Sequence, residues 1–144
     1  MSEAVGQRGK LAEKEVEAVL KKFNNRADFT YHRMPDARAA MGRLAASPGD
    51  FLYFFKDSSG FIEVKSTKHA FRLSKASFSQ FPTLCKFAEA GAASWLLVHH
   101  SEQGLWRCVQ PEALSTDTTS WDLSAWRTYD NALEALEVNL LCSA

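Results

Sequence analysis

Residues 48–66 read PGDFLYFFKDSSGFIEVKS, and this stretch decides the fold. Two runs rich in aromatic and β-branched residues, 51–55 and 61–66, stand on either side of the polar residues 56–60. Such runs around a short polar loop that contains glycine predict a β-hairpin.

Side chains alternate between the two faces of a strand, so Glu63 and Lys65 share one face of the second run. If Lys56 pairs with Phe61 across the loop, Asp50 lies on the same face as Glu63 and Lys65. In this register Asp50 is diagonal to Lys65, at roughly 7–8 Å between Cβ atoms. The hairpin therefore predicts two carboxylates and a lysine on one face.

These three charges on a mostly apolar hairpin are costly unless something compensates for them. A divalent metal ion would do so, since Mg²⁺ takes oxygen ligands, is often held by one or two carboxylates, and completes its shell with water and substrate phosphate. Lys65 would then orient the attacking water and stabilise charge on a scissile phosphate. The other interpretation is a Glu and Lys pair on the solvated side of a sheet.

The segment 9–23 predicts an amphipathic helix, because its apolar residues recur at helical spacing. At about 100° per residue, Glu13 lies on the rim of the apolar stripe, whereas Glu15 and Glu17 lie farther round with the solvent-facing charges. The residues of the stripe are Ala12, Val16, Val19, Leu20 and Phe23. Glu13 is thus the acid of this helix that we expect to matter for a site.

The rest of the chain adds further elements to the hairpin and the first helix. In order, they are a strand at 28–33, an insert at 34–49, a second helix at 79–90 with Pro82 in its first turn, a buried strand at 94–99, its partner at 105–109, an irregular tail at 115–129 and a last helix capped by Asn131. This order predicts one α/β domain over residues 1–144, with a central mixed β-sheet flanked by helices.

Three motifs together resemble a known group of proteins. Asp50, preceded by Pro-Gly, and Glu63-Val64-Lys65, with twelve residues between Asp50 and Glu63, resemble the motif of the PD-(D/E)XK nuclease superfamily. GKLAEKE at 9–15 resembles the first-helix motif of its Holliday junction resolvase branch, and KASFSQF at 75–81 resembles the segment after the catalytic strand in RecU-type resolvases. The resemblance to RecU and Hjc resolvases spans roughly residues 6–110, and residues 111–144 have no counterpart that we can place.

The resemblance implies a restriction-endonuclease-like fold and a Mg²⁺-dependent endonuclease, with Mn²⁺ as a substitute, that resolves four-way DNA junctions. It implies Asp50, Glu63 and Glu13 as metal ligands, Lys65 as the catalytic lysine, and Gln80 beside the metal or the phosphate. Because symmetric cleavage of a junction needs two active sites, we expect a C2 homodimer.

The insert 34–49 corresponds, by the same resemblance, to a stalk that enters the junction, with Arg38 and Arg43 as phosphate contacts. Just beyond the hairpin lies a second group of candidates for the DNA backbone: Lys68, His69, Arg72 and Lys75. Phosphate contacts need only positive donors within reach, and a solvated basic loop is the equally weighted alternative.

The charge distribution agrees with a nucleic-acid partner although the formal net charge is zero. Residues 1–75 hold fourteen Lys and Arg against nine Asp and Glu, and residues 76–144 hold three against eight, which gives +5 and −5. Such asymmetry within one domain indicates a basic working surface, and the alternative is a solvated surface whose charges are unevenly distributed by chance. We expect no membrane segment and a cytoplasmic protein, since the start MSE is polar and no apolar run approaches 18 residues.

Two other functions remain open at this stage. The same acidic cluster serves restriction, repair and single-strand nucleases, so the fold cannot choose among DNA substrates. A nuclease-like domain that only binds DNA is a further alternative. Retention of Asp50, Glu63 and Lys65 favours an enzyme over such a module.

Overall fold

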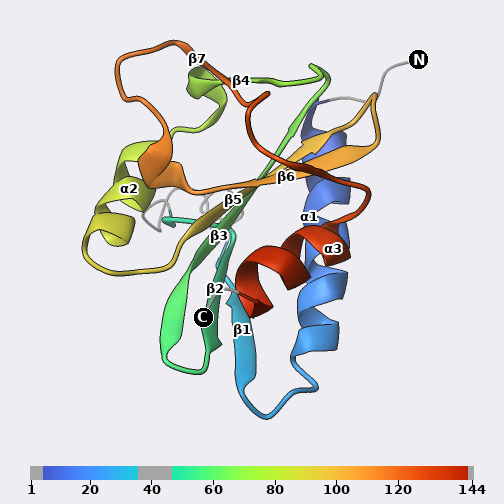
Figure 1. The fold of residues 1–144 in the computed structure, drawn as a ribbon, viewed down its shortest axis with the longest axis vertical. Helices are drawn as coiled ribbons and strands as arrows, with labels where there is room; N and C mark the ends of the chain where they lie inside the picture. The colour runs from blue at the N-terminus through green and yellow to red at the C-terminus, as the bar shows by residue number, and fades with distance from the viewer. Residues whose placement is uncertain (1–4, 36–46, 143–144) are drawn as a thin grey trace.

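A central sheet organises the computed structural model, which describes residues 5–35 and 47–142 (Figure 1). The sheet has six strands in the order β1-β2-β3-β5-β6-β8. Among the described strands, β3 and β5 form the single parallel pair of this mixed sheet. The strands are β1 (Phe29–Arg33), β2 (Phe51–Phe55), β3 (Ser58–Thr67), β5 (Trp95–His100), β6 (Leu105–Val109) and β8 (Thr128–Tyr129).

Helices cover both faces of the sheet, as the sequence predicts. Figure 1 shows α1 (Val5–Phe23) and α3 (Ala132–Leu136) on one side of it and α2 (Phe81–Glu89) on the other. A small antiparallel sheet of β4 (Arg72–Ser74) and β7 (Ser120–Asp122) lies on the α2 side. Each face has its own core of buried side chains. We call these the α1 face and the α2 face.

The first helix buries the predicted stripe. It begins at Val5, four residues before the expected Gly9, and ends at Phe23. The stripe residues Ala12, Val16, Val19, Leu20 and Phe23 are at most 6% exposed and belong to the α1-face core. Burial of aliphatic and aromatic side chains at about 1.5–3 kcal/mol each is what holds this helix on the sheet.

The hairpin register differs from the predicted one. β3 begins at Ser58, and the turn consists of Lys56 and Asp57 alone. Lys56 has φ 55°, the left-handed conformation found in two-residue turns whose twist matches that of the strands. The partner of Leu52 therefore moves from Lys65 to Phe61. Because this is a shift of four residues, an even number, the faces stay as predicted.

Gly60 lies inside β3 and not in the turn. The backbone of Ala93 comes close to it there. A Cβ at Gly60 would lie 2.3 Å from the carbonyl oxygen of Ala93. We expect Gly60→Ala to lower the free energy of unfolding by about 1–3 kcal/mol, since the two backbones must separate. Urea denaturation measures this.

Gly9→Ala is the control for this variant. A Cβ on Gly9 in α1 would meet nothing within 4 Å, so the free energy of unfolding should rise by about 0.5–1 kcal/mol. An unchanged midpoint for Gly60→Ala would contradict the close approach.

The segment after β6 is more regular than the predicted irregular tail. β7 pairs with β4, and β8 pairs with β6 at the edge of the central sheet. Trp121 of β7 is 3% exposed in the α2-face core, and this burial orders a stretch whose sequence has no strand periodicity.

The two later helices follow the expected signals. α2 begins at Phe81, two residues later than expected, with Pro82 in its first turn, and Gly91 follows it with φ 113°. The Asn131 side chain accepts a hydrogen bond of 2.8 Å from the Glu134 amide and so caps α3. α3 continues into a π-helical turn, Glu137–Leu141, whose Leu140 is buried.

None of the helices in the described ranges is long and apolar enough to cross a bilayer. Most of the predicted insert 34–49, including Arg38 and Arg43, lies outside the described residues.

Candidate active site

Asp50 is held firmly at the entrance to the hairpin. Its amide donates to the Ile62 carbonyl at 2.9 Å, and its own carbonyl accepts from Met34 at 2.9 Å. Its carboxylate oxygen Oδ2 accepts from the Val64 amide at 2.8 Å. Continuation of the observed register places Asp50 directly opposite Glu63, whereas the predicted register placed it opposite residue 67; in both registers Asp50 is diagonal to Lys65. The changed register thus brings the two carboxyl groups face to face.

Gly49 permits this close approach. A Cβ on Gly49 would lie 3.0 Å from both the Ile62 carbonyl oxygen and the Phe61 Cβ, tighter than ordinary van der Waals contact. The glycine before Asp50 is therefore needed for the chain to enter the sheet beside β3.

Glu63 is buried on the α2 face, with 3% of its surface exposed. Burial raises the pKa of Glu63 far above its usual value, and the hydrogen bond with the Asp50 carboxyl and the charge of Asp50 act in the same direction. Lys65 opposes the shift. Two close carboxyls cannot both ionise easily in a buried site, so the pair shares a proton when nothing positive lies between them.

Lys65 lies two residues farther along β3 and points to the same face. Its Nζ is 5.3 Å from the ring centroid of Phe78, which is buried in the α2-face core. The Lys65 ammonium group is also close enough to Glu63 for its charge to lower the pKa of that carboxyl. The prediction that Asp50, Glu63 and Lys65 share one face agrees with this geometry.

Gln80 precedes α2, the helix that covers the face of Glu63 and Lys65. Its side-chain oxygen Oε1 is buried and has no hydrogen-bond partner among the described residues. A buried polar atom without a partner costs about 1–3 kcal/mol. Such an atom fits a bound water, cation or other donor that completes the site.

Glu13 takes a different position from the other two acids. α1 packs on the α1 face, and Glu13 accepts a hydrogen bond of 3.4 Å from Arg33, the last residue of β1. Arg33 also pairs with Glu17 at 2.9 Å. Residues 5–35 and 47–142 contain no group of three His, Cys, Asp or Glu side chains spaced to hold a metal ion. The structure thus unites Asp50 with Glu63 but does not add Glu13 to them.

The basic segment after β3 is ordered by contacts with the rest of the domain. The Nδ1 atom of His69 accepts from the amides of Phe71 at 3.2 Å and Arg72 at 3.1 Å. Lys75 donates from Nζ to the Thr116 carbonyl. This predicted DNA contact is therefore already hydrogen-bonded within the protein. Lys68 and Arg72 keep partly or fully exposed side chains.

Sequence reasoning passed over Arg107, which the structure places in a buried network with His100 on the α2 face. The one signal available was a charged residue within the otherwise apolar run LWRCV at 105–109. A charge in a buried strand predicts a hydrogen-bonded partner elsewhere in the fold.

The donor set of the site suits Mg²⁺ chemically. Asp50 and Glu63 offer carboxylate oxygens, and Gln80, which the resemblance places beside the metal or the phosphate, has a buried amide oxygen without a partner among the described residues. Mg²⁺ prefers such hard oxygen ligands and needs few of them from the protein. Burial of Glu63 and the neighbouring Asp50 carboxyl both raise the pKa of Glu63, and a positive ion between the two carboxyls would offset this cost.

A mixed sheet flanked by helices, with Asp50, Glu63 and Lys65 on its hairpin, defines an α/β domain. The fold is similar to that of Hjc, a Holliday junction resolvase from the archaeal hyperthermophile Archaeoglobus fulgidus, with a TM-score of 0.54 and 20% sequence identity. The match covers 88% of this chain and 98% of Hjc. No family model matches the sequence, and none of the curated proteins does. The comparison establishes the fold.

Proposed function

We propose that this protein is a metal-dependent endonuclease that resolves four-way DNA junctions by phosphodiester hydrolysis. The observation that carries the proposal is the hydrogen-bonded carboxyl pair of the buried Glu63 and the partly buried Asp50 beside Lys65. This cluster lies on the central hairpin of a fold that is similar to a Holliday junction resolvase.

Asp50 and Glu63 would hold Mg²⁺, or Mn²⁺ in its place, with Gln80 contributing through Oε1 to the metal or to its water. Glu13, which the resemblance adds as a third ligand, lies with α1 beside Arg33, so it would join the acidic cluster only after a rearrangement of this region. When bound, the ion supplies Lewis acidity and lowers the pKa of a coordinated water.

The protein's own side chains then have distinct tasks. Asp50, fixed by three hydrogen bonds through its backbone and Oδ2, orients the ligand set. Lys65 positions the attacking water and stabilises the negative charge that develops on the scissile phosphate. Lys68, His69 and Arg72 contact the DNA backbone, Lys75 does so if it leaves Thr116, and Arg38 and Arg43 reach the junction from the insert.

A second copy of the chain would supply the second active site. Phe54 and Phe87 are 50% and 40% exposed on the α2 face. Phe87 contacts Phe61 edge to face at 4.9 Å between centroids, and Phe61 pairs with Leu52, two residues from Phe54. An apolar patch next to the carboxyl pair suits a C2 interface that directs both sites to one junction.

We expect Phe54→Glu with Phe87→Glu to weaken dimerisation by at least about tenfold, because each buried phenylalanine contributes about 1.5–3 kcal/mol. Sedimentation velocity over a concentration series measures this. Val138→Glu, an exposed apolar position in the last helical turn, is the matched control and should leave association unchanged. A wild-type protein that stays monomeric with junction DNA would contradict the dimer.

Competition between DNA substrates tests the substrate class. A labelled four-way junction is cleaved in Mg²⁺ while unlabelled linear duplex of equal length is added in excess, and the reverse experiment is run in parallel. We expect the junction to be preferred. Preference for linear duplex would indicate another PD-(D/E)XK nuclease of the restriction, repair or single-strand type, and binding without cleavage would indicate a non-catalytic module.

A further inference from the structure

A buried polar network lies beneath the basic segment that follows β3. His100 is fully buried and Arg107 is 7% exposed. Arg107 donates from NH1 to His100 Nε2 at 2.9 Å and to the Ala70 carbonyl at 2.8 Å, and from Nε to the Trp126 carbonyl at 3.0 Å. One guanidinium group thus joins β6 to three other segments of the chain.

The two hydrogen-bond partners of His100 determine which of its ring nitrogens carries the proton. A guanidinium group has donors but no acceptor, so Nε2 of His100 must accept and carries no proton. Nδ1 then carries the proton and donates to the His69 carbonyl at 2.7 Å. The His100 ring is neutral in this structure, and its two nitrogens are both occupied.

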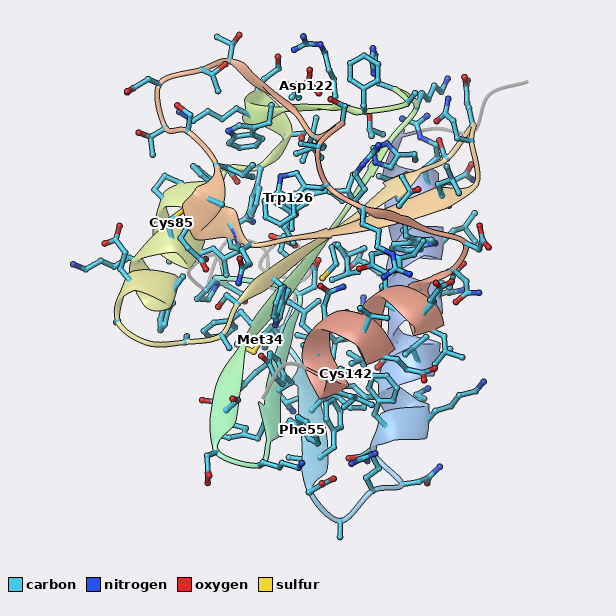
Figure 2. All side chains as sticks on the ribbon, in the orientation of Figure 1. Met34, Phe55, Cys85, Asp122, Trp126 and Cys142 are labelled. Atoms are coloured by element: carbon cyan, nitrogen blue, oxygen red, sulfur yellow. The ribbon has the colours of Figure 1, made fainter. Side chains whose placement is uncertain are left out.

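Three consecutive carbonyls of the basic segment are held from below by different elements. His69 binds His100 of β5, Ala70 binds Arg107 of β6, and Phe71 accepts from the Leu123 amide at 2.7 Å. Figure 2 shows Trp126 beneath the small sheet that carries Asp122. The course of residues 67–72 is therefore set by buried groups. Lys68 is partly exposed, and the exposed Arg72 donates from its guanidinium group to the Ser120 hydroxyl at 3.4 Å.

Arg107 lies in register with Lys65 across neighbouring strands of the central sheet. Lys65 pairs with Val98 of β5, and Val98 pairs with Arg107 of β6. Neighbouring strands lie about 4.8 Å apart, so the backbone positions of Lys65 and Arg107 are separated by roughly 10 Å on one face. A segment anchored at Arg107 is thereby held at a set distance from Lys65.

We propose that His100 and Arg107 are positioning residues for DNA binding, which fix residues 67–72 so that Lys68 and Arg72 contact the DNA backbone next to the active site. The inference rests on the proposed nuclease function and adds to it residues that touch no DNA. Their effect on binding is transmitted through the carbonyls of His69 and Ala70.

The contacts of His100 also predict what its protonation in acid would do to the network. Burial lowers the pKa of His100, and the charges of Arg107, His99 and His69 act in the same direction, whereas the hydrogen bond to the His69 carbonyl opposes them. The charge of Asp122 acts on Arg107. Protonation of Nε2 would place a donor against the guanidinium group and break the bond to Arg107. Release of residues 67–72 in acid would then weaken DNA binding.

The test measures binding of a four-way junction and of a linear duplex by fluorescence anisotropy in EDTA, across a series of salt concentrations. Arg107→Lys keeps the charge, but one ammonium group cannot reach Trp126, Ala70 and His100 together. His100→Gln cannot bind both of its partners at once. We expect each variant to bind about tenfold more weakly, with a log–log salt slope that is shallower by about 0.9 for each phosphate that the protein no longer neutralises.

A double-mutant cycle separates positioning from a general structural role. Lys68→Ala with Arg72→Ala should weaken binding clearly in the wild-type background and much less in the Arg107→Lys background. Arg127→Lys, at an exposed position near the C-terminal segment, is the matched control and should bind as the wild type does. Unchanged salt slopes in Arg107→Lys and His100→Gln, or additive effects in the cycle, would overturn this inference alone. Absence of DNA binding by the wild type would overturn the proposed function and this inference with it.

Discussion

Replacing Lys65 with methionine is expected to lower the rate of junction cleavage by about 10²–10³ or more while junction binding persists. Methionine keeps an unbranched apolar side chain but removes the ammonium group, which lies 5.3 Å from the Phe78 ring centroid and would stabilise charge on the phosphate. Single-turnover cleavage of a labelled junction measures the rate, and anisotropy measures binding.

Lys86→Met is the control for this variant, since Lys86 is an exposed lysine of α2 with the same change of charge. It should cleave at the wild-type rate. Equal rates for Lys65→Met and Lys86→Met would mean that Lys65 has no part in the chemistry.

Glu63→Gln is expected to abolish cleavage and yet to stabilise the metal-free protein at pH 8, by about 1–3 kcal/mol. In the folded state the pKa of Glu63 is raised, so the carboxyl keeps its proton at neutral pH, whereas in the unfolded chain it ionises above its ordinary value of 4.5. The folded state therefore binds more protons, and wild-type stability falls as pH rises from 4.5. Glutamine removes this pH-dependent destabilisation because it never ionises.

Urea denaturation in EDTA at pH 4.5 and pH 8 measures this effect. The difference between Glu63→Gln and wild type should be small at pH 4.5 and favour the variant at pH 8. Added Mg²⁺ should raise the stability of the wild type at pH 8 by binding the folded state, and should do so much less for the variant. A variant that is less stable than the wild type at both pH values would contradict a buried carboxyl pair.

Local sequence signals were sufficient to predict the helices, their buried faces and their ends. The stripe from Ala12 to Phe23, the turn into α2 at Pro82 and the cap at Asn131 all depend on neighbouring residues, and each agrees with the structure. The faces of Glu63 and Lys65 also agree, because side-chain alternation survives any even shift of register.

The hairpin register was wrong because the turn conformation was not evident from residue types. Lys56 adopts φ 55°, a conformation that is usually predicted from asparagine or glycine. Gly60 suggested a loop at 56–60, but in the structure this glycine lies in β3, where it allows the close approach of the Ala93 backbone. The observed register strengthens the candidate site, since it moves Asp50 opposite Glu63.

Long-range contacts account for most of what the sequence did not predict. Arg72 of β4 lies opposite Asp122 of β7, and Arg107 binds Ala70 across 37 residues of chain. No spacing rule links such positions. The pairing of Glu13 with Arg33 in place of the expected acidic cluster is of the same kind, because the helical wheel placed Glu13 on a rim without saying which neighbour it meets.

The most direct measurement is incubation of a four-way junction, labelled in turn on each strand, with wild-type protein in Mg²⁺ and in EDTA. If Asp50, Glu63 and Lys65 form a metal-dependent nuclease centre, paired symmetric nicks with 5′-phosphate ends appear in Mg²⁺, and none appears in EDTA or with Lys65→Met. A junction that stays intact at every concentration of Mg²⁺ and Mn²⁺, while the protein is bound to it, would contradict the nuclease function.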